Sequence, residues 1–196
     1  MKKTILIALF YAIILTAFGQ KLPILDLRDK RNSEIEFPEN LEVNEIGIII
    51  KLTGGWSAYD NISYYIFKNN GNVIAYSEQT PKSYLRKTKG LKDTLTQFKL
   101  YIEQKKKFIE LLNSNKTIDF IKYSQKDFKN SDLNLPPPCP ITDAIGYQFT
   151  FVQNGKENSY KYYAPEYILK RCDDKNVNKT VLGKFVELIN LWAKPK

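Results

Sequence analysis

Two cysteines are the residues whose type most limits the chemistry of this chain. Cys139 lies inside the stretch LNLPPPCPITD, directly between two prolines, and Cys172 is the other cysteine. A reactive thiol needs a nearby base or a helix N-terminus that lowers its pKa, and Pro-Cys-Pro supplies neither in sequence. The residues from Pro137 to Pro140 also match the P-x-x-P pattern, which binds aromatic grooves as a polyproline helix. The third interpretation is a disulfide between Cys139 and Cys172, and the export signal described below favours it.

Histidine does not occur in the sequence. Ser-His-Asp and Cys-His catalytic sets are therefore excluded, as are histidine ligands for zinc, copper or haem. The phosphate-binding patterns GxxxxGK[ST] and GxGxxG are missing, and so is the calcium-binding spacing of an EF-hand. We therefore expect no cofactor and no metal ion, and we expect the protein not to be an enzyme.

Carboxylates are among the few groups left that could support catalysis. A glycoside hydrolase needs two of them at a set separation across a cleft. Asp60, Asp143 and Glu166 lie near the ends of expected strands and are the candidates for such a pair. Simpler roles are also open, because Asp143 suits a turn or cap and Glu166, after Pro165, suits the start of a helical turn. A carboxylate-dependent hydrolase acting on glycans is therefore kept as an alternative function.

The loop TGGWSAYD contains the aromatic residues that best fit a binding role. Trp56 follows Gly54 and Gly55, and Tyr59 lies a short step further along the loop. Such a loop can present an aromatic tip to a sugar, a peptide or a partner protein, and tryptophan is enriched at binding hot spots. The alternative is that Trp56 folds back over the core, since tryptophan is usually well buried. We name Trp56 and Tyr59 as candidate binding residues and leave both interpretations open.

The start of the chain has the features of a secretory signal peptide. Residues 1–19 read MKKTILIALFYAIILTAFG, with Lys2 and Lys3 ahead of an apolar run and with Ala17 and Gly19 at the −3 and −1 positions of a cleavage site. The apolar run is shorter than the ~20 residues that a spanning helix prefers, so an uncleaved membrane anchor fits less well. We predict cleavage after Gly19 and no stable membrane insertion of the mature protein.

Export and charge together narrow the expected location and partners. The chain is rich in Lys, Asn, Ile and Tyr, whose codons are AT-rich, which indicates a low-GC bacterial source and a destination in the periplasm or outside the cell. Loss of Lys2 and Lys3 with the signal peptide lowers the formal net charge from +9 to +7. A basic balance favours an acidic partner surface, and an exported protein rarely meets nucleic acid, so no nucleic-acid partner is expected.

The elements that must position these residues follow from hydrophobic patterning. Residues 20–40 are polar and irregular and are interpreted as an N-terminal arm, and residues 41–196 as a single α+β domain. β-branched and alternating runs predict five strands, at 43–52, 62–68, 72–78, 144–153 and 158–165. Asn-Gly turns close two hairpins, at 69–72 and 154–155. Apolar residues at helical spacing predict helices over 91–113 and 181–192, and residues 118–124 are expected to form a short helix or strand.

Hairpins separated by helices predict an α+β fold. The expected architecture is an antiparallel sheet of about five strands, a three-stranded meander plus a second hairpin, with two main helices packed on one face. Tyr64 and Tyr65 are adjacent on one expected strand and therefore point to opposite faces of it. We expect one of these two side chains to reach solvent.

The leading functional hypothesis is a small exported bacterial protein that acts as a non-enzymatic binding module for a protein or cell-envelope partner. An immunity or inhibitor protein is one specific form of this hypothesis, with a partner whose surface is acidic. Two alternatives belong to other classes: the glycan hydrolase named above, and a structural or adhesive envelope protein that binds polymer through exposed aromatic residues.

Overall fold

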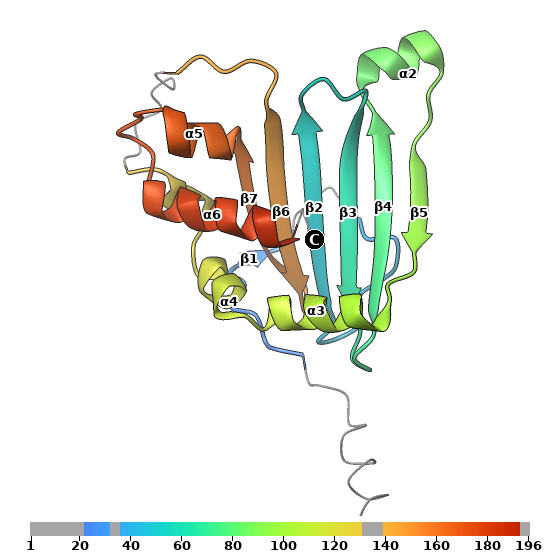
Figure 1. The fold of residues 1–196 in the computed structure, drawn as a ribbon. Helices are drawn as coiled ribbons and strands as arrows, with labels where there is room; N and C mark the ends of the chain where they lie inside the picture. The colour runs from blue at the N-terminus through green and yellow to red at the C-terminus, as the bar shows by residue number, and fades with distance from the viewer. Residues whose placement is uncertain (1–21, 32–35, 131–138, 193–196) are drawn as a thin grey trace, which may run out of the picture.

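The chain folds around one open antiparallel sheet with helices on one of its faces (Figure 1). The computed structural model describes residues 22–31, 36–130 and 139–192, so the predicted signal peptide at 1–19 lies outside the described residues. The strands are β1 (Asp29–Lys30), β2 (Ile46–Gly54), β3 (Tyr59–Phe67), β4 (Val73–Pro81), β5 (Thr94–Phe98), β6 (Ile145–Gln153) and β7 (Lys156–Tyr163). The helices are α2 (Ser83–Lys89), α3 (Ile102–Leu112), α4 (Asn115–Ile121), α5 (Pro165–Arg171) and α6 (Lys179–Trp192), with a 3-10 helix η1 (Gln125–Phe128).

Hairpins set the order of the sheet, which is β1-β7-β6-β2-β3-β4-β5. Strands β2, β3 and β4 form the predicted meander, and β6 with β7 forms the predicted second hairpin. The turns contain residues that accept positive φ, namely Gly71 at 78°, Asn154 at 51° and Gly155 at 73°. Pairing of β2 with β6 joins the meander to the hairpin. The predicted α+β class is therefore confirmed, with seven strands rather than about five.

The expected helix over 91–113 is wrong in its first part. The residues Thr94–Phe98 form β5, which pairs antiparallel with β4, and helix α3 begins only at Ile102. Thr94 and Thr96 are β-branched, and the free edge of β4 offers backbone hydrogen-bond partners that stabilise an extended conformation. The other additional strand, β1, is two residues long and pairs with β7 at the opposite edge.

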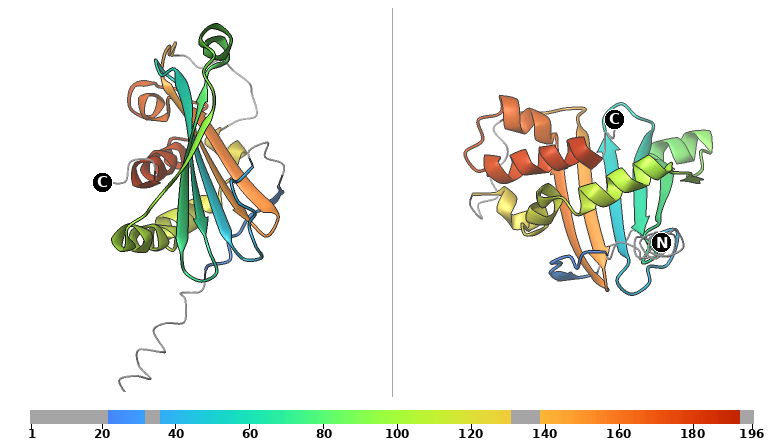
Figure 2. Two further views of the ribbon diagram at one scale, coloured as in Figure 1. Left: turned by 90° about the vertical axis from the view of Figure 1, so that its right-hand side faces the viewer. Right: turned by 60° about the horizontal axis from the view of Figure 1, so that its bottom comes forward.

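The larger core lies between the sheet and helices α3, α4, α5 and α6 (Figure 2). The indole of Trp192 stacks on the ring of Phe108 with centroids 5.8 Å apart, and its N–H donates a hydrogen bond to Thr117 Oγ1 at 3.3 Å. Helix α6 is capped by Asn178, whose Oδ1 accepts from the backbone N–H of Val181 at 3.2 Å. An aromatic stack at one end and a cap at the other thus fix the last helix against the sheet.

The opposite face of the sheet is covered by part of the N-terminal arm. The ring of Phe37 packs edge-on against Tyr64, with centroids 6.0 Å apart. It also lies over Gly47, where an added Cβ would come within 2.2 Å of the ring. Glu39 forms an ion pair with Lys68 at 3.5 Å. The missing side chain of Gly47 therefore provides the space that lets the arm lie directly on the sheet.

Tyr64 and Tyr65 are both buried, so the expectation that one of them reaches solvent is wrong. They do point to opposite faces: Tyr65 enters the helix-side core beside Phe108, at 4.6 Å between ring centroids, and Tyr64 lies beneath Phe37. The second face is covered by a segment far away in the sequence, which alternation along a strand cannot reveal.

The first part of the arm also packs onto the sheet. Leu22, Leu25 and Leu27 are buried in the helix-side core. The side chain of Gln153 accepts a hydrogen bond from the backbone N–H of Leu25 at 2.8 Å and donates one to the carbonyl of Pro23 at 2.9 Å. The described residues of the expected 20–40 arm thus contribute apolar surface and an edge strand.

Candidate functional site

Trp56 lies at the tip of the turn between β2 and β3, and 91% of its surface is exposed. Gly54 and Gly55 have φ of 83° and 62°, a region that side chains with a Cβ rarely adopt. A Cβ on Gly54 would lie 2.7 Å from the carbonyl oxygen of Ala144, and the N–H of Gly55 donates to that same oxygen at 3.0 Å. The glycines therefore hold the turn against the segment before β6, and the interpretation of Trp56 as a cover for the core is wrong.

Tyr59, the second predicted binding residue, is the first residue of β3 and is half-buried. It lies opposite Pro81 of β4, on the face of the sheet that bears the helices. The hydroxyl of Ser57 donates to the carbonyl of Tyr59 at 2.8 Å, which fixes the return of the turn into the strand. Tyr59 therefore flanks the turn, whereas Trp56 is its exposed tip.

Further exposed apolar side chains lie at the same end of the sheet as Trp56. Ile145 begins β6, Tyr163 ends β7 and Tyr167 lies in α5, and each is exposed over a large fraction of its surface. We call Trp56, Ile145, Tyr163 and Tyr167 the aromatic edge. Neither Ile145 nor the two tyrosines were named as binding residues from the sequence. Tyr163 and Tyr167 flank Ala164-Pro165, and this break between a strand and a helix was the available signal.

Specific contacts hold the aromatic edge together. The Cβ position of Gly55 lies 3.6 Å from Cγ1 of Ile145, which places the turn of Trp56 against the start of β6. The hydroxyl of Tyr163 accepts a hydrogen bond from the backbone N–H of Ala144 at 2.9 Å. Ile145 and Tyr167 line a common hollow of about 240 Å³ between β6 and α5. Ile145 and Tyr167 therefore share one hollow beside the Trp56 turn, whereas the ring of Tyr163 lies next to Gly146 on the opposite face of the same end of the sheet.

Helix α2 flanks this surface and is strongly basic (Figure 1). The backbone N–H of Lys82 donates to the carbonyl of Ala58 at 3.0 Å, and its ammonium donates to the carbonyl of Gly55 at 2.9 Å. Helix α2 therefore begins directly beside the Trp56 turn. Its last turn contains Arg86, Lys87 and Lys89, and none of its residues is buried. A helix that contributes nothing to the core is available for contacts outside the molecule.

The three carboxylates predicted as possible catalytic groups lie on separate elements. Asp60 is in β3, opposite Thr80, Asp143 is in the loop before β6 with φ of 56°, and Glu166 is in the first turn of α5. Asp143 and Glu166 thus occupy the turn and helix-start positions that their sequence context indicated. Among the seven residues that line the hollow beneath Tyr167, Glu166 is the single carboxylate.

Two other carboxylates, Asp119 and Glu187, line one small hollow of about 180 Å³ between α4 and α6. Each is paired with a lysine, Asp119 with Lys122 at 2.7 Å and Glu187 with Lys116. The hydrogen bond and charge of Lys122 lower the pKa of Asp119. A general acid needs a raised pKa, so the lowered pKa of Asp119 does not suit that role.

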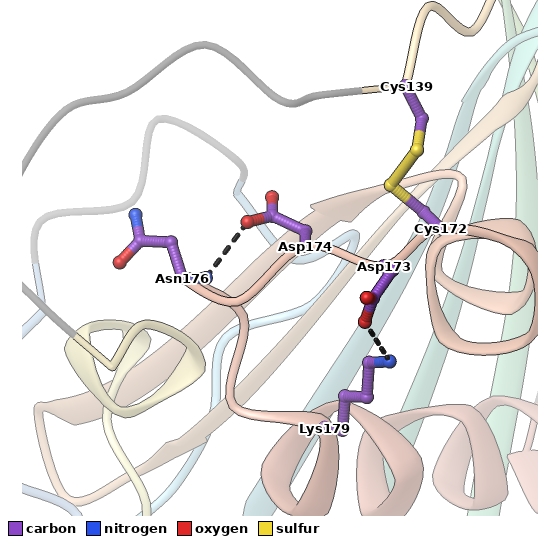
Figure 3. The surroundings of a disulfide bond; sticks show 6 residues. All are labelled: Cys139, Cys172, Asp173, Asp174, Asn176 and Lys179. Atoms are coloured by element: carbon purple, nitrogen blue, oxygen red, sulfur yellow. Dashed lines mark hydrogen bonds and ion pairs between the residues drawn. A yellow bond between two sulfur atoms is a disulfide. The ribbon is translucent and has the colours of Figure 1, made fainter.

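The structure joins Cys139 and Cys172 in a disulfide, with their Cα atoms 6.0 Å apart (Figure 3). Cys172 directly follows α5 and is buried in the helix-side core, and Cys139 packs against the same core. Beyond Cys172, Asp173 pairs with Lys179 of α6 at 3.4 Å. The disulfide therefore ties the segment that leads into β6 to the connection between the last two helices.

A hollow of about 430 Å³ lies beside the disulfide and is lined by residues such as Phe128, Cys139 and Tyr162. Burial, and then the negative charge of Asp174, raise the pKa of the Tyr162 phenol to about 12. Cys139, which lines this hollow, is the first described residue after 131–138.

Within residues 22–31, 36–130 and 139–192, no three His, Cys, Asp or Glu side chains converge in a way that could hold a metal ion. In the same ranges, no helix has the length and apolar character needed to cross a bilayer. Compared with known proteins, the chain matches no protein-family model and no curated protein sequence.

Proposed function

We propose that this protein is an exported, non-enzymatic binding module whose aromatic edge, together with helix α2, contacts an acidic surface on a protein or cell-envelope partner. The observation that carries the proposal is the exposure of Trp56 on a turn that is fixed from two sides. Its neighbour Gly55 is hydrogen-bonded both to the segment before β6 and to Lys82 at the start of α2.

A fixed, exposed indole suits binding for an energetic reason. Aromatic side chains bury roughly 150–250 Å² when they are covered, which at ~25 cal/mol/Å² amounts to about 4–6 kcal/mol before ordering costs. Those costs are small when the backbone under the side chain is already held in place. Exposed Ile145, which lies against the Trp56 turn, and Tyr167, which lines the same hollow as Ile145, add apolar area at this end of the sheet. Tryptophan and tyrosine are the residues that most often dominate the energetics of an interface.

The charge of the flanking helix favours an acidic partner. Lys87 and Lys89 extend from the last turn of α2, and Arg86 pairs with Asp93 on the loop that follows. Positive charge at the rim of an apolar patch accelerates association with an acidic surface and disfavours basic partners. Binding through this surface is expected to weaken as salt is added, because exposed charges are screened.

Export is part of the proposal, and two observations support it. The first is the signal-peptide pattern of residues 1–19. The second is the disulfide between Cys139 and Cys172, since such bonds persist mainly in oxidising compartments. The periplasm or the cell exterior is the location we propose.

The test is affinity capture from the cell envelope of the source organism with the chain lacking residues 1–19 as bait. Two variants serve as comparisons: a charge reversal at Lys87 and Lys89 to Glu, and a reversal at Lys106 and Lys107 of α3 as the matched control. We expect the wild type and the control to retain the same acidic protein and the α2 variant to lose it. Equal capture by all three baits would contradict the proposed role of α2, and retention of polysaccharide alone would favour an adhesive protein instead.

A further inference from the structure

Strand β5 is the outermost strand on one side of the open sheet, and no described element lies beyond it along its length (Figure 1). All five of its residues, Thr94–Phe98, are exposed. An edge strand presents unpaired backbone N–H and C=O groups, and natural proteins usually shorten such a strand or place charges and prolines on it. The sequence TLTQF contains neither a charge nor a proline. At the other edge, β1 is only two residues long.

Exposed apolar side chains gather around this edge. Leu95 and Phe98 lie on β5, with 53% and 36% of their surfaces exposed, and Tyr101 and Ile102 follow at the start of α3 with 73% and 85%. Four of the large apolar side chains that face solvent therefore fall within eight consecutive residues. None of them belongs to the aromatic edge, so this surface is separate from the one described above.

The sequence of β5 matches itself in one antiparallel register. When Thr96 lies opposite Thr96 of a second copy, Leu95 faces Gln97 and Phe98 faces Thr94. The same register places Asp93 directly opposite Lys99, twice by symmetry. Moving one copy along the other by two residues, in either direction, keeps every side chain on its face of the sheet. Both Asp93 and Lys99 then lie opposite uncharged residues. Opposite charges directly across a strand pair are stabilising, so this register is preferred over its neighbours.

The surroundings of β5 fit a second copy. Helix α3 starts near this edge and runs away from it across the face of the sheet that bears the helices, so it leaves the strand accessible (Figure 1). A hollow of about 340 Å³ lies between the start of β4, the end of β5 and α3, and Lys99 and Lys105 line it, so positive charge gathers at this end of β5. Asp93 itself is held in place by its ion pair with Arg86.

We propose that two copies of this chain associate through β5, antiparallel and centred on Thr96, to form one continuous sheet across both molecules. The two-fold axis is perpendicular to the sheet, so the helices of both copies lie on the same side. The aromatic edge of each copy remains open, and the dimer presents two of them.

Charge reversal tests the proposed interface. Sedimentation equilibrium of the chain lacking residues 1–19, at about 0.15 M salt, is expected to show a dimer. Lys99→Asp and Asp93→Lys each turn two attractive pairs into two repulsive ones, and each variant alone should dimerise about tenfold more weakly. An equimolar mixture of the two variants restores both pairs and should dimerise like the wild type. A monomeric wild type, or a mixture that associates no better than its components, would overturn the proposal.

Cysteine cross-linking tests the register. Directly opposite residues in an antiparallel pair have Cα atoms about 4.5–5.5 Å apart, within the range of a disulfide. Thr96→Cys should therefore form a covalent dimer under mild oxidation. Leu95→Cys is the matched control, because two copies of residue 95 would lie about 7–8 Å apart on the diagonal. Cross-linking of the Leu95 variant but not of the Thr96 variant would refute the pairing.

Discussion

Removal of the disulfide between Cys139 and Cys172 is the perturbation whose size follows most directly from the structure. The bond closes a loop with a sequence separation of 33 residues. In the chain-entropy model, opening such a loop gives the unfolded chain about 12.5 cal/mol/K of additional entropy, which is about 3.7 kcal/mol at 25 °C. For a chain of this length, that loss corresponds to a fall in Tm of roughly 10 °C.

Two independent ways of breaking the bond separate loop closure from packing. The first is reduction of the wild type, which leaves both sulfur atoms in place. The second is the double variant Cys139→Ala/Cys172→Ala, which also removes the Cys172 sulfur from the helix-side core. Urea denaturation should show a loss near 3.7 kcal/mol on reduction and a somewhat larger loss for the double variant, because of the cavity. A change below about 0.5 kcal/mol on reduction would refute the loop-closure reasoning.

Three further predictions concern the core and its two faces. In urea denaturation, Gly47→Ala should lower the free energy of unfolding by about 1–3 kcal/mol, because the new Cβ displaces the ring of Phe37. When Phe37→Ala is already present, adding Gly47→Ala should lower it little further. Additive losses in the double variant would contradict the contact. Tyr160→Phe should cost about 1 kcal/mol by the same assay, since its hydroxyl donates to the buried carbonyl of Ile121 at 2.9 Å, and an unchanged midpoint would show that this bond is not stabilising. The pKa of Tyr162 in the folded protein, about 12, lies above its ordinary value of 10.0, so folding favours the neutral phenol. The contribution of Tyr162 to the free energy of unfolding is therefore complete below pH 10 and is lost as the pH rises toward 12. Tyr162→Phe should reduce this alkaline loss in denaturation measured between pH 9 and pH 12, and an identical pH profile would contradict the assignment.

The hairpins could be predicted because their signals are local. Asn154-Gly155 accepts positive φ, and the alternating residues on either side of it define the register of β6 and β7. The pairing of Cys139 with Cys172 was also accessible, since a chain with two cysteines and an export signal leaves one intramolecular choice. The meander β2–β3–β4 followed from β-branched runs in the same way.

Features that depend on distant segments could not be predicted. Leu95 and Phe98 fit a helical spacing, and pairing with β4 decided in favour of a strand. Tyr64 looked half-exposed because the segment that buries it, with Phe37, lies far away in the sequence. The Trp56 turn lies against Ile145, which shares a hollow with Tyr167, so the aromatic edge depends on contacts between segments far apart in the sequence. In the sequence, only Trp56 had the glycine context that indicates an exposed loop.

The central claim is that Trp56 is the main contact of a binding surface, and a titration of the captured partner tests it most directly. Isothermal titration calorimetry would compare the wild type with Trp56→Ala and with Val43→Ala, a control at the opposite end of the sheet whose side chain is 76% exposed. Because both side chains face solvent, neither variant should change the free energy of unfolding by more than about 0.5 kcal/mol. We predict that Trp56→Ala weakens the affinity for the partner by at least about 30-fold, which corresponds to the loss of a hot-spot residue worth ~2 kcal/mol. Val43→Ala should leave the affinity unchanged. Equal affinities of all three proteins for the partner would contradict the account.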